Sequence, residues 1–356
     1  MREVLAALPR FEETGPSHAG LAHERYAPQK DDTSKDENSS PWRRWLSWMD
    51  GAREPEHYGV AYHRWRGSLT QWHTASVEMR ATGRLLAGHG NASPTGVGLT
   101  LHHTWGVPVI PGSSLKGVLA AYLRASFEPA EVAEACRRLF GVPGDERLGR
   151  KASVGQVLFH DAPWVSDWDK ETKKGPRTLA RDVLTVHQRG WYGKAESWPN
   201  DYESPNPVEF LSVRPGGRFL VALSVAPGAD DETLRLLRWA ADRLCEALRD
   251  FGVGGKTAAG YGRLVPEGSV VVAAPRVVSR PSPERDAFKA WGEAQRAAKT
   301  EQRKVLEDFD AQWRPRLMPL SREARKECAE ALRGWVRNPK LQERRDELLR
   351  LLVDGA

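Results

Sequence analysis

The stretch FGVGGKTAAGYGRL, residues 251–264, directs the interpretation of the whole chain, because it places five glycines around a lysine, a tyrosine and an arginine. The preceding residues 231–250, DETLRLLRWAADRLCEALRD, have the apolar spacing of a helix, and the apolar run before Pro266 predicts a short strand. Dense glycines let a backbone adopt positive φ and approach a ligand, and exposed amides suit anionic oxygens. The order helix, glycine loop, strand therefore predicts an anion-binding loop.

The charged and aromatic residues of this loop suit a phosphodiester strand. Lys256 and Arg263 supply positive charge to phosphates, and Tyr261 offers a ring on which a base can stack. We expect the two cations to act through phosphate charge, and Gly255 to let the backbone come close to RNA. The side chains that could contact such a strand are therefore those of Lys256, Tyr261 and Arg263.

Two nucleotide-binding motifs fail at the same loop. A P-loop needs a glycine where Asp250 stands, and it runs from strand to helix instead of from helix to strand. A dinucleotide-binding loop needs its third glycine where Thr257 stands. A glycine-rich turn that binds no ligand stays open as the ordinary structural alternative.

Composition excludes several classes of protein. The 356 residues are 40% hydrophobic and 28% charged, and no stretch has the apolar length of a membrane span. The N-terminus has no apolar signal core, so we expect a cytoplasmic protein. The three cysteines are far apart and form no CxxC pair, which argues against a disulfide framework and a cysteine zinc site. No cofactor or metal is expected, and the net charge of +6 permits nucleic-acid binding without proving it.

A second candidate anion site lies in PGSSLKGVLAAYLRASF, residues 111–127, which has helical apolar spacing. Ser113 or Ser114 can cap this helix, and Lys116 falls in its first turn, where a cation opposes the helix dipole. Helix N-terminal amides, two serines and a lysine together suit an anion. An ordinary capped helix stays open as the alternative.

The order of the expected elements along the core predicts an α+β fold of the ferredoxin-like (RRM-like) type. An open sheet of this type often presents its face to single-stranded RNA. The expected elements are a strand at 76–88, extended structure at 99–112, helices at 111–127 and 128–141, a strand at 154–164, a long loop without periodicity at 165–210, a hairpin at 207–227 turning at PGG, the helix 231–250 and the final strand.

The two ends of the chain differ from this core. Residues 1–72 form a polar, Trp-rich extension, in which Trp42, Trp45 and Trp48 share a helical face that is typical of a core or interface. Residues 271–356 form a charged helical extension beyond the core at 73–270. Solvated helix faces are its ordinary interpretation, and a partner-binding or RNA-facing appendage is the alternative.

Three motifs in this order resemble the RAMP superfamily of CRISPR effector subunits, and within it the sixth-subunit family of the type III-B (Cmr) complex. They are GVGLTLHHTWGVPVIPGSSLKGVL (96–119), RDVLTVHQRGWYG with SPNPVEFLSV (181–213) and GVGGKTAAGYGRL (252–264). The resemblance covers roughly residues 75–266 and implies a ferredoxin-like RAMP core with long insertions. It gives no counterpart for the two ends of the chain.

The resemblance also implies a function. It places the protein in a ribonucleoprotein that defends against foreign RNA, near the 3′ end of the guide RNA, as a non-catalytic structural subunit with no membrane association. The implied partners are guide (CRISPR) RNA, target RNA and the backbone, small and terminal RAMP subunits. It implies that Ser113, Ser114 and Lys116 face guide RNA, and His187 is a further RNA-binding candidate. It also implies that the glycine loop faces guide RNA through Gly252, Gly254, Gly255, Lys256, Thr257, Gly260, Tyr261 and Arg263.

Two enzyme classes compete with this reading. A metal-independent endoribonuclease that processes guide precursors would draw its acid and base from His102, His103, His187, Tyr261 or Lys256. Because neighbouring residues of an extended segment point to opposite faces, His102 and His103 cannot act as a close pair. A metal enzyme has as its starting point only His160 beside Asp161, with no third ligand at a recognisable spacing.

Overall fold

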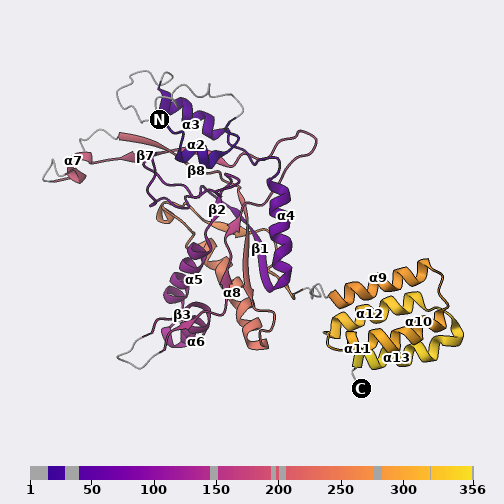
Figure 1. Cartoon of the computed structure of the whole chain (residues 1–356). Helices are drawn as coiled ribbons and strands as arrows, with labels where there is room; N and C mark the ends of the chain where they lie inside the picture. The colour runs from indigo at the N-terminus through magenta and orange to yellow at the C-terminus, as the bar shows by residue number, and fades with distance from the viewer. Residues whose placement is uncertain are drawn as a thin grey trace. The chain divides into compact units, whose positions relative to one another are not determined.

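The computed structural model describes residues 15–28, 40–144, 151–193, 198–199, 206–275, 283–320 and 322–354. It divides into two compact units, Met1–Pro275 and Arg276–Ala356, and each has its own hydrophobic core. Figure 1 draws the first unit from indigo to orange and the second from orange to yellow. Among the described residues, no helix is long and apolar enough to cross a membrane.

The first unit is an α+β structure. Its helices are α2 (Ala19–Glu24), α3 (Pro41–Asp50), α4 (Tyr58–Ser68), α5 (Gly112–Ser126), α6 (Pro129–Phe140), α7 (Arg189–Tyr192) and α8 (Asp231–Asp250). Its longer strands are β1 (His73–Ala81), β7 (Leu179–Val186), β8 (Asn206–Val213) and β9 (Arg218–Val225), and its short ones are β2 (Val109–Ile110), β3 (Gly141–Val142), β4 (Ser153–Val154), β5 (Leu158–Phe159), β6 (Ala162–Pro163), β10 (Leu264–Pro266) and β11 (Val271–Ala273).

The central sheet has the ferredoxin-like arrangement. Its strands lie in the order β10-β1-β9-β5, every pair is antiparallel, and β11 extends the sheet beside β1. Along the chain, β1, α5, β5, β9, α8 and β10 follow one another as a βαββαβ unit. The predicted ferredoxin-like core is therefore confirmed, with long insertions between its elements.

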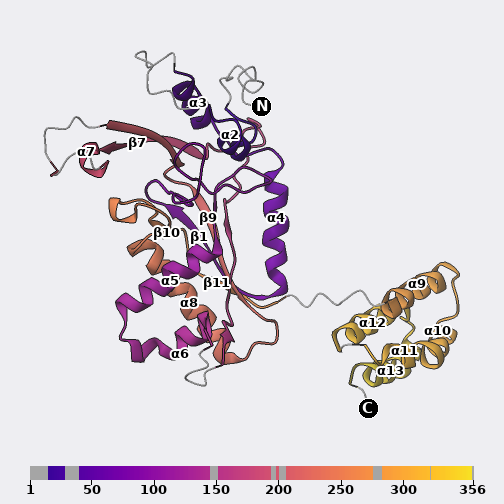
Figure 2. The same cartoon turned by 60° about the vertical axis from the view of Figure 1, so that its left-hand side comes forward.

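One face of this sheet packs against α5 and α8 (Figure 2). Alternate side chains of β1 lie on this face, because successive residues of a strand point to opposite faces. Val77 and Met79 are buried on this face, opposite Val221 and Phe219 of β9. The apolar stripe of α8 completes the layer, and the Asp230 side chain caps the start of that helix by accepting from the Thr233 amide at 2.7 Å.

Helix α4 covers the other face of the sheet at β1 and β9. The Trp65 ring packs edge-on against His160 at 6.4 Å between ring centroids, and His160 Nε2 lies 2.9 Å from the Ser224 Oγ. Thr74, also on this face, donates to the Leu69 carbonyl just beyond α4 at 3.0 Å. Since Thr74 and Ser224 are buried, this end of the sheet face is covered and is not open to RNA.

Strands β7 and β8 form a separate two-stranded ribbon, with Leu179 opposite Val213 at one end and Val186 opposite Asn206 at the other. Figure 1 shows the ribbon extending away from the central sheet, with α7 beyond it. The predicted loop at 165–210 therefore contains a strand. The predicted hairpin at 207–227 is also wrong, because β8 pairs with β7 while β9 pairs with β1. The PGG segment still turns the chain, and Gly216 has a φ of 81°.

The tryptophan stripe of α3 is a core feature, as its helical spacing predicts. Trp42 and Trp45 are buried with ring centroids 5.0 Å apart, and Trp48 is half-buried against the same core. The helices predicted at 111–127 and 128–141 form as α5 and α6, and Gly141 ends α6 with a φ of 75°. In place of a single strand at 154–164, the chain forms the short strands β4, β5 and β6.

The second unit is helical, as predicted. It consists of α9 (Pro283–Ala297), α10 (Gln302–Asp308), the π-helical turn η3 (Phe309–Trp313), α11 (Arg314–Leu317), α12 (Arg322–Trp335), the 3-10 helix η4 (Pro339–Leu341) and α13 (Gln342–Asp354). Phe288 lies at the centre of its core, with the rings of Trp313 and Trp335 at 5.5 and 5.1 Å. Gly292 provides the space that Trp335 occupies.

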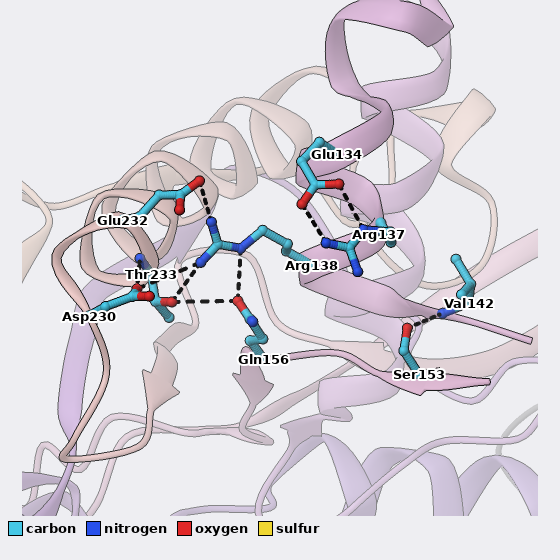
Figure 3. Close-up of polar contacts among 9 residues, drawn as sticks. All are labelled: Glu134, Arg137, Arg138, Val142, Ser153, Gln156, Asp230, Glu232 and Thr233. Atoms are coloured by element: carbon cyan, nitrogen blue, oxygen red, sulfur yellow. Dashed lines mark hydrogen bonds and ion pairs between the residues drawn. The ribbon is translucent and has the colours of Figure 1, made fainter. Parts of the chain in front are cut away.

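Arg138, near the end of α6, joins α6 to the start of α8 (Figure 3). Its guanidinium donates to the Gln156 Oε1 at 2.9 Å and to the Thr233 Oγ1 at 2.8 Å, and it forms an ion pair with Glu232. The side chain is only 9% exposed. Its neighbour Arg137 instead forms an ion pair with Glu134 of the same helix, and both of these side chains are exposed.

These neighbouring arginines form a matched pair for a stability test. We expect Arg138→Ala to lower the free energy of unfolding of the first unit by about 2–3 kcal/mol, because buried charge-assisted hydrogen bonds are lost. Arg137→Ala should change it little, because an exposed ion pair on one helix contributes little. Urea unfolding followed by tryptophan fluorescence measures both, and equal losses in the two variants would contradict the structural role of Arg138.

Candidate nucleic-acid interface

The glycine loop follows α8 and packs its backbone on the chain that leaves β1. The Gly255 amide donates to the Leu86 carbonyl and the Gly262 amide to the Arg84 carbonyl, both at 2.8 Å. Within the loop, the Val253 amide donates to the Gly262 carbonyl at 2.9 Å. These bonds fix the inward side of the loop against the protein itself.

This close packing explains several of the glycines. A Cβ at Gly254, where φ is 90°, would lie 2.5 Å from the Leu86 carbonyl oxygen. A Cβ at Gly255 would lie 2.7 Å from the Cβ of His89, so this glycine allows approach to its own chain. A valine at Gly255 would collide with His89, so we expect it to disturb the packing of the loop as well as any contact with RNA.

The outward side of the loop is different. The 3-10 helix η2 (Thr257–Ala259) and Gly260 form it, and Ala258, Ala259 and Gly260 are exposed. Gly260 has a φ of 88° and open space where a side chain would stand. The backbone amides without a hydrogen-bond acceptor among the described residues are those of Gly254, Lys256, Thr257 and Ala258.

The two cations of the loop are placed differently. Lys256 has a left-handed backbone with φ 59°, and its ammonium has no hydrogen bond or ion pair in the described part of the chain. Arg263 instead donates to the carbonyl of Arg249 at 3.1 Å and to the carbonyl of Asp250. These carbonyls belong to the last turn of α8, where a cation also complements the helix dipole.

Tyr261 joins the loop to the ribbon. Its hydroxyl donates to the Asp182 carboxylate of β7, and Asp182 also pairs with Arg84 at 3.0 Å. Desolvation, followed by this hydrogen bond and the charge of Asp182, raises the pKa of Tyr261 to about 12, so its phenol stays protonated at neutral pH. The ring that was expected to stack on a base is thus held at the base of the ribbon through its hydroxyl.

The start of α5 is already occupied by groups of the protein. The helix begins at Gly112 with Pro111 as its N-cap, so the prediction that Ser113 or Ser114 caps it is wrong. The Gly112 amide donates instead to the Asp161 carboxylate at 2.7 Å. The Asp161 carboxylate therefore occupies the position at the start of α5 where a phosphate was expected to bind.

Lys116 also has an internal partner. Its ammonium donates to the carbonyl of Phe140, the last residue of α6, at 3.3 Å, and lies 6.0 Å from the centroid of that ring. Ser113 is exposed and Ser114 half-buried. Among the described residues, no hydrogen bond or ion pair joins these three residues to the glycine loop.

His187 is exposed just beyond the end of β7. A strand rises about 3.3 Å per residue, which puts His187 roughly 16 Å along the ribbon from Asp182. His187 therefore lies away from the contact between the ribbon and the glycine loop.

Three residues at the glycine loop were not singled out from the sequence. Arg84 and Asp182 hold Tyr261 and the ribbon in place, and His89 packs against Gly255. The sequence carries one usable signal, the segment TGRLLAGHG at 82–90, which has the glycines and basic residues of a second loop. Its contact with residues 252–263 is long-range and cannot be read from local spacing.

The groups that suggested catalysis or metal binding have structural partners. His160 lies against Ser224, and its neighbour Asp161 accepts from the Gly112 amide. Burial lowers the pKa of His102, whose Nδ1 accepts from the Thr104 amide at 3.2 Å. The described residues contain no group of three or more His, Cys, Asp or Glu side chains that could hold a metal ion.

A protein-family match and a related sequence show which known proteins this chain resembles. Residues 68–265 match the RAMP superfamily. The CRISPR system Cmr subunit Cmr6 of Pyrococcus furiosus is 31% identical over a 258-position alignment, which covers 59% of this chain and 73% of the relative.

Two solved structures show low overall similarity to this chain. The crystal structure of Cmr6 from Pyrococcus furiosus has 28% identity and a TM-score of 0.29, covering 55% of this chain and 98% of that one. A chain of the type III-B Cmr-beta complex bound to cognate target RNA has 17% identity and a TM-score of 0.47, covering 66% and 73%. The superfamily match, which spans more than half of the sequence and includes β1, α5, β9, α8 and the glycine loop, assigns the chain to the RAMP superfamily.

Proposed function

We propose that this chain is a non-catalytic, guide-RNA-binding structural subunit of a type III-B CRISPR effector, near the 3′ end of the guide. Membership of the RAMP superfamily and the 31% identity to a Cmr6 subunit support the complex. Its partners are then guide RNA, target RNA and the other Cmr subunits, and its role is cytoplasmic defence against foreign RNA.

The observation that carries the RNA contact is the outward side of the glycine loop. Four amides without acceptors in the described residues and the unpaired Lys256 ammonium lie within residues 254–258. Amides and a lysine neutralise and hydrogen-bond phosphates but do not distinguish bases. This chemistry suits a guide whose sequence varies.

The loop is also organised before RNA arrives. Its inward amides are bonded to Arg84 and Leu86, and Tyr261 is held by Asp182. A preformed loop loses little conformational freedom on binding, and less of the interaction energy is spent on ordering it.

The same geometry supports a non-catalytic role over the alternative of a guide-processing endoribonuclease. Tyr261 has its proton committed to Asp182, and the His102 ring accepts from a local amide. His187 lies beyond the far end of β7. A general acid and base must both reach the reacting phosphate, and two of these groups are engaged in local hydrogen bonds while the third lies away from the glycine loop.

Lys256 and Arg263 should respond differently to loss of charge. We expect Lys256→Gln to weaken binding of single-stranded RNA for all sequences alike. The slope of log K against log salt should become shallower by about 0.7, the value for one phosphate contact. Arg263→Gln should instead lower the melting temperature, because the final carbonyls of α8 lose their donor.

Fluorescence anisotropy at several salt concentrations and thermal unfolding measure these two effects. Lys256→Arg, which keeps the charge, is the control for binding. An unchanged slope in Lys256→Gln, with RNA still bound, would remove the glycine loop from the interface.

We further expect a labelled precursor of the guide RNA to stay intact on a denaturing gel after incubation with the purified chain and a chelator. The variants His102→Ala, His103→Ala and His187→Ala should give the same pattern as the unchanged protein. Cleavage at a fixed position that one of these variants abolishes would favour the processing endoribonuclease.

A further inference from the structure

The second unit carries a concentration of positive charge at one of its ends. Two turns meet there, because the Gln302 side-chain oxygen accepts from the amides of both Arg337 and Asn338 at 2.9 Å. The turn after α9 and the turn after α12 are thereby joined. At the opposite end, Arg325 donates to the Leu352 carbonyl at 3.0 Å and joins the start of α12 to the end of α13.

The joined turns gather exposed cations that have no ion pair among the described residues. These cations are Arg296, Lys299, Lys304, Arg333, Arg337 and Lys340, and we name them the basic end. The acids of the same turns are Glu301 and Glu343. Other basic residues of this unit are neutralised, as in the pairs Arg314 with Asp310 and Arg344 with Glu347.

Helix stability explains only part of the basic end. Arg296 and Arg333 fall in the last turns of α9 and α12, where cations complement the helix dipole. Lys304 lies in the first turn of α10, and Lys340 precedes the start of α13. Cations at helix N-termini oppose the dipole, so the stability of α10 does not explain Lys304 and the stability of α13 does not explain Lys340.

The surface of the unit favours a polyanion over a protein partner. No large apolar side chain is strongly exposed in the described residues 283–320 and 322–354. Protein interfaces depend on buried aromatic and apolar anchors, whereas a nucleic-acid backbone is held by exposed lysine and arginine. Charge complementarity therefore points to phosphates.

We propose that the basic end is a second RNA-binding surface, which contacts the sugar–phosphate backbone of single-stranded RNA. This inference rests on the proposed function, because it assumes that the chain works on RNA, but the surface lies outside the matched residues 68–265. Two separate surfaces on one chain would lengthen its contact with RNA and add to affinity through effective concentration.

The test uses the full chain and a labelled single-stranded RNA. The variant Lys304→Gln with Lys340→Gln removes the two cations that the helix dipoles leave unexplained. Its matched control is Lys326→Gln with Arg350→Gln, two exposed lysine and arginine residues on α12 and α13 toward the opposite end. We expect the first variant to lower the salt slope by roughly 1.4, for two phosphate contacts, with an unchanged melting temperature. The control should bind as the unchanged protein does.

The loop variant Lys256→Gln distinguishes the two proposals. Weaker binding in Lys256→Gln with normal binding in the basic-end variant would overturn this inference and leave the proposed function intact. Equal slope changes in the basic-end variant and its control would also overturn it, since net charge alone would then matter. Absence of RNA binding by the unchanged chain would contradict both proposals.

A second measurement addresses a protein partner. Size-exclusion chromatography of the chain with the other effector subunits, without RNA, should give the same assembly for the basic-end variant and the unchanged protein. Loss of assembly together with unchanged RNA affinity would overturn the inference in favour of an acidic protein surface.

Discussion

Close backbone packing between the glycine loop and the chain that leaves β1 is the contact on which the first unit depends. Through the amides of Gly255 and Gly262, it joins the end of α8 and the start of β10 to residues 84–86. Through Tyr261 and Asp182 it also fixes the base of the β7–β8 ribbon. Side chains at Gly254 or Gly255 would separate these backbones, so the glycines are needed for the fold before any ligand is considered.

The same packing explains why net charge is a poor guide to the RNA surface. Several cations are used inside the structure: Arg138 joins two helices, Lys116 caps α6, and Arg263 caps α8. Each of these residues satisfies a carbonyl or hydroxyl that would otherwise lack a donor. Lys256 has no hydrogen bond or ion pair in the described part of the chain, which is why this residue, rather than the overall charge of +6, supports a phosphate contact.

Local sequence patterns predicted the helices well, and the strands and long-range pairings poorly. The helical periods of α5 and α8 and the tryptophan spacing of α3 are confirmed because burial follows from spacing within one element. The hairpin at 207–227 failed because β8 finds its partner in β7, which the sequence showed only as part of a loop. The prediction that a serine caps α5 was wrong for a similar reason, since the Asp161 carboxylate that accepts from the Gly112 amide comes from a distant segment. At the candidate site, the sequence predicted the glycine loop but not Arg84, His89 or Asp182, whose roles depend on tertiary contacts.

Replacing Lys256 with a photoreactive amino acid, in the assembled effector with a guide RNA labelled at its 3′ end, tests the central claim most directly. The account predicts a light-dependent cross-link between this position and the guide RNA, at the same distance from its 3′ end for guides of different sequence. Cross-links exclusively to neighbouring proteins, or an RNA cross-link that depends on the guide sequence, would contradict it.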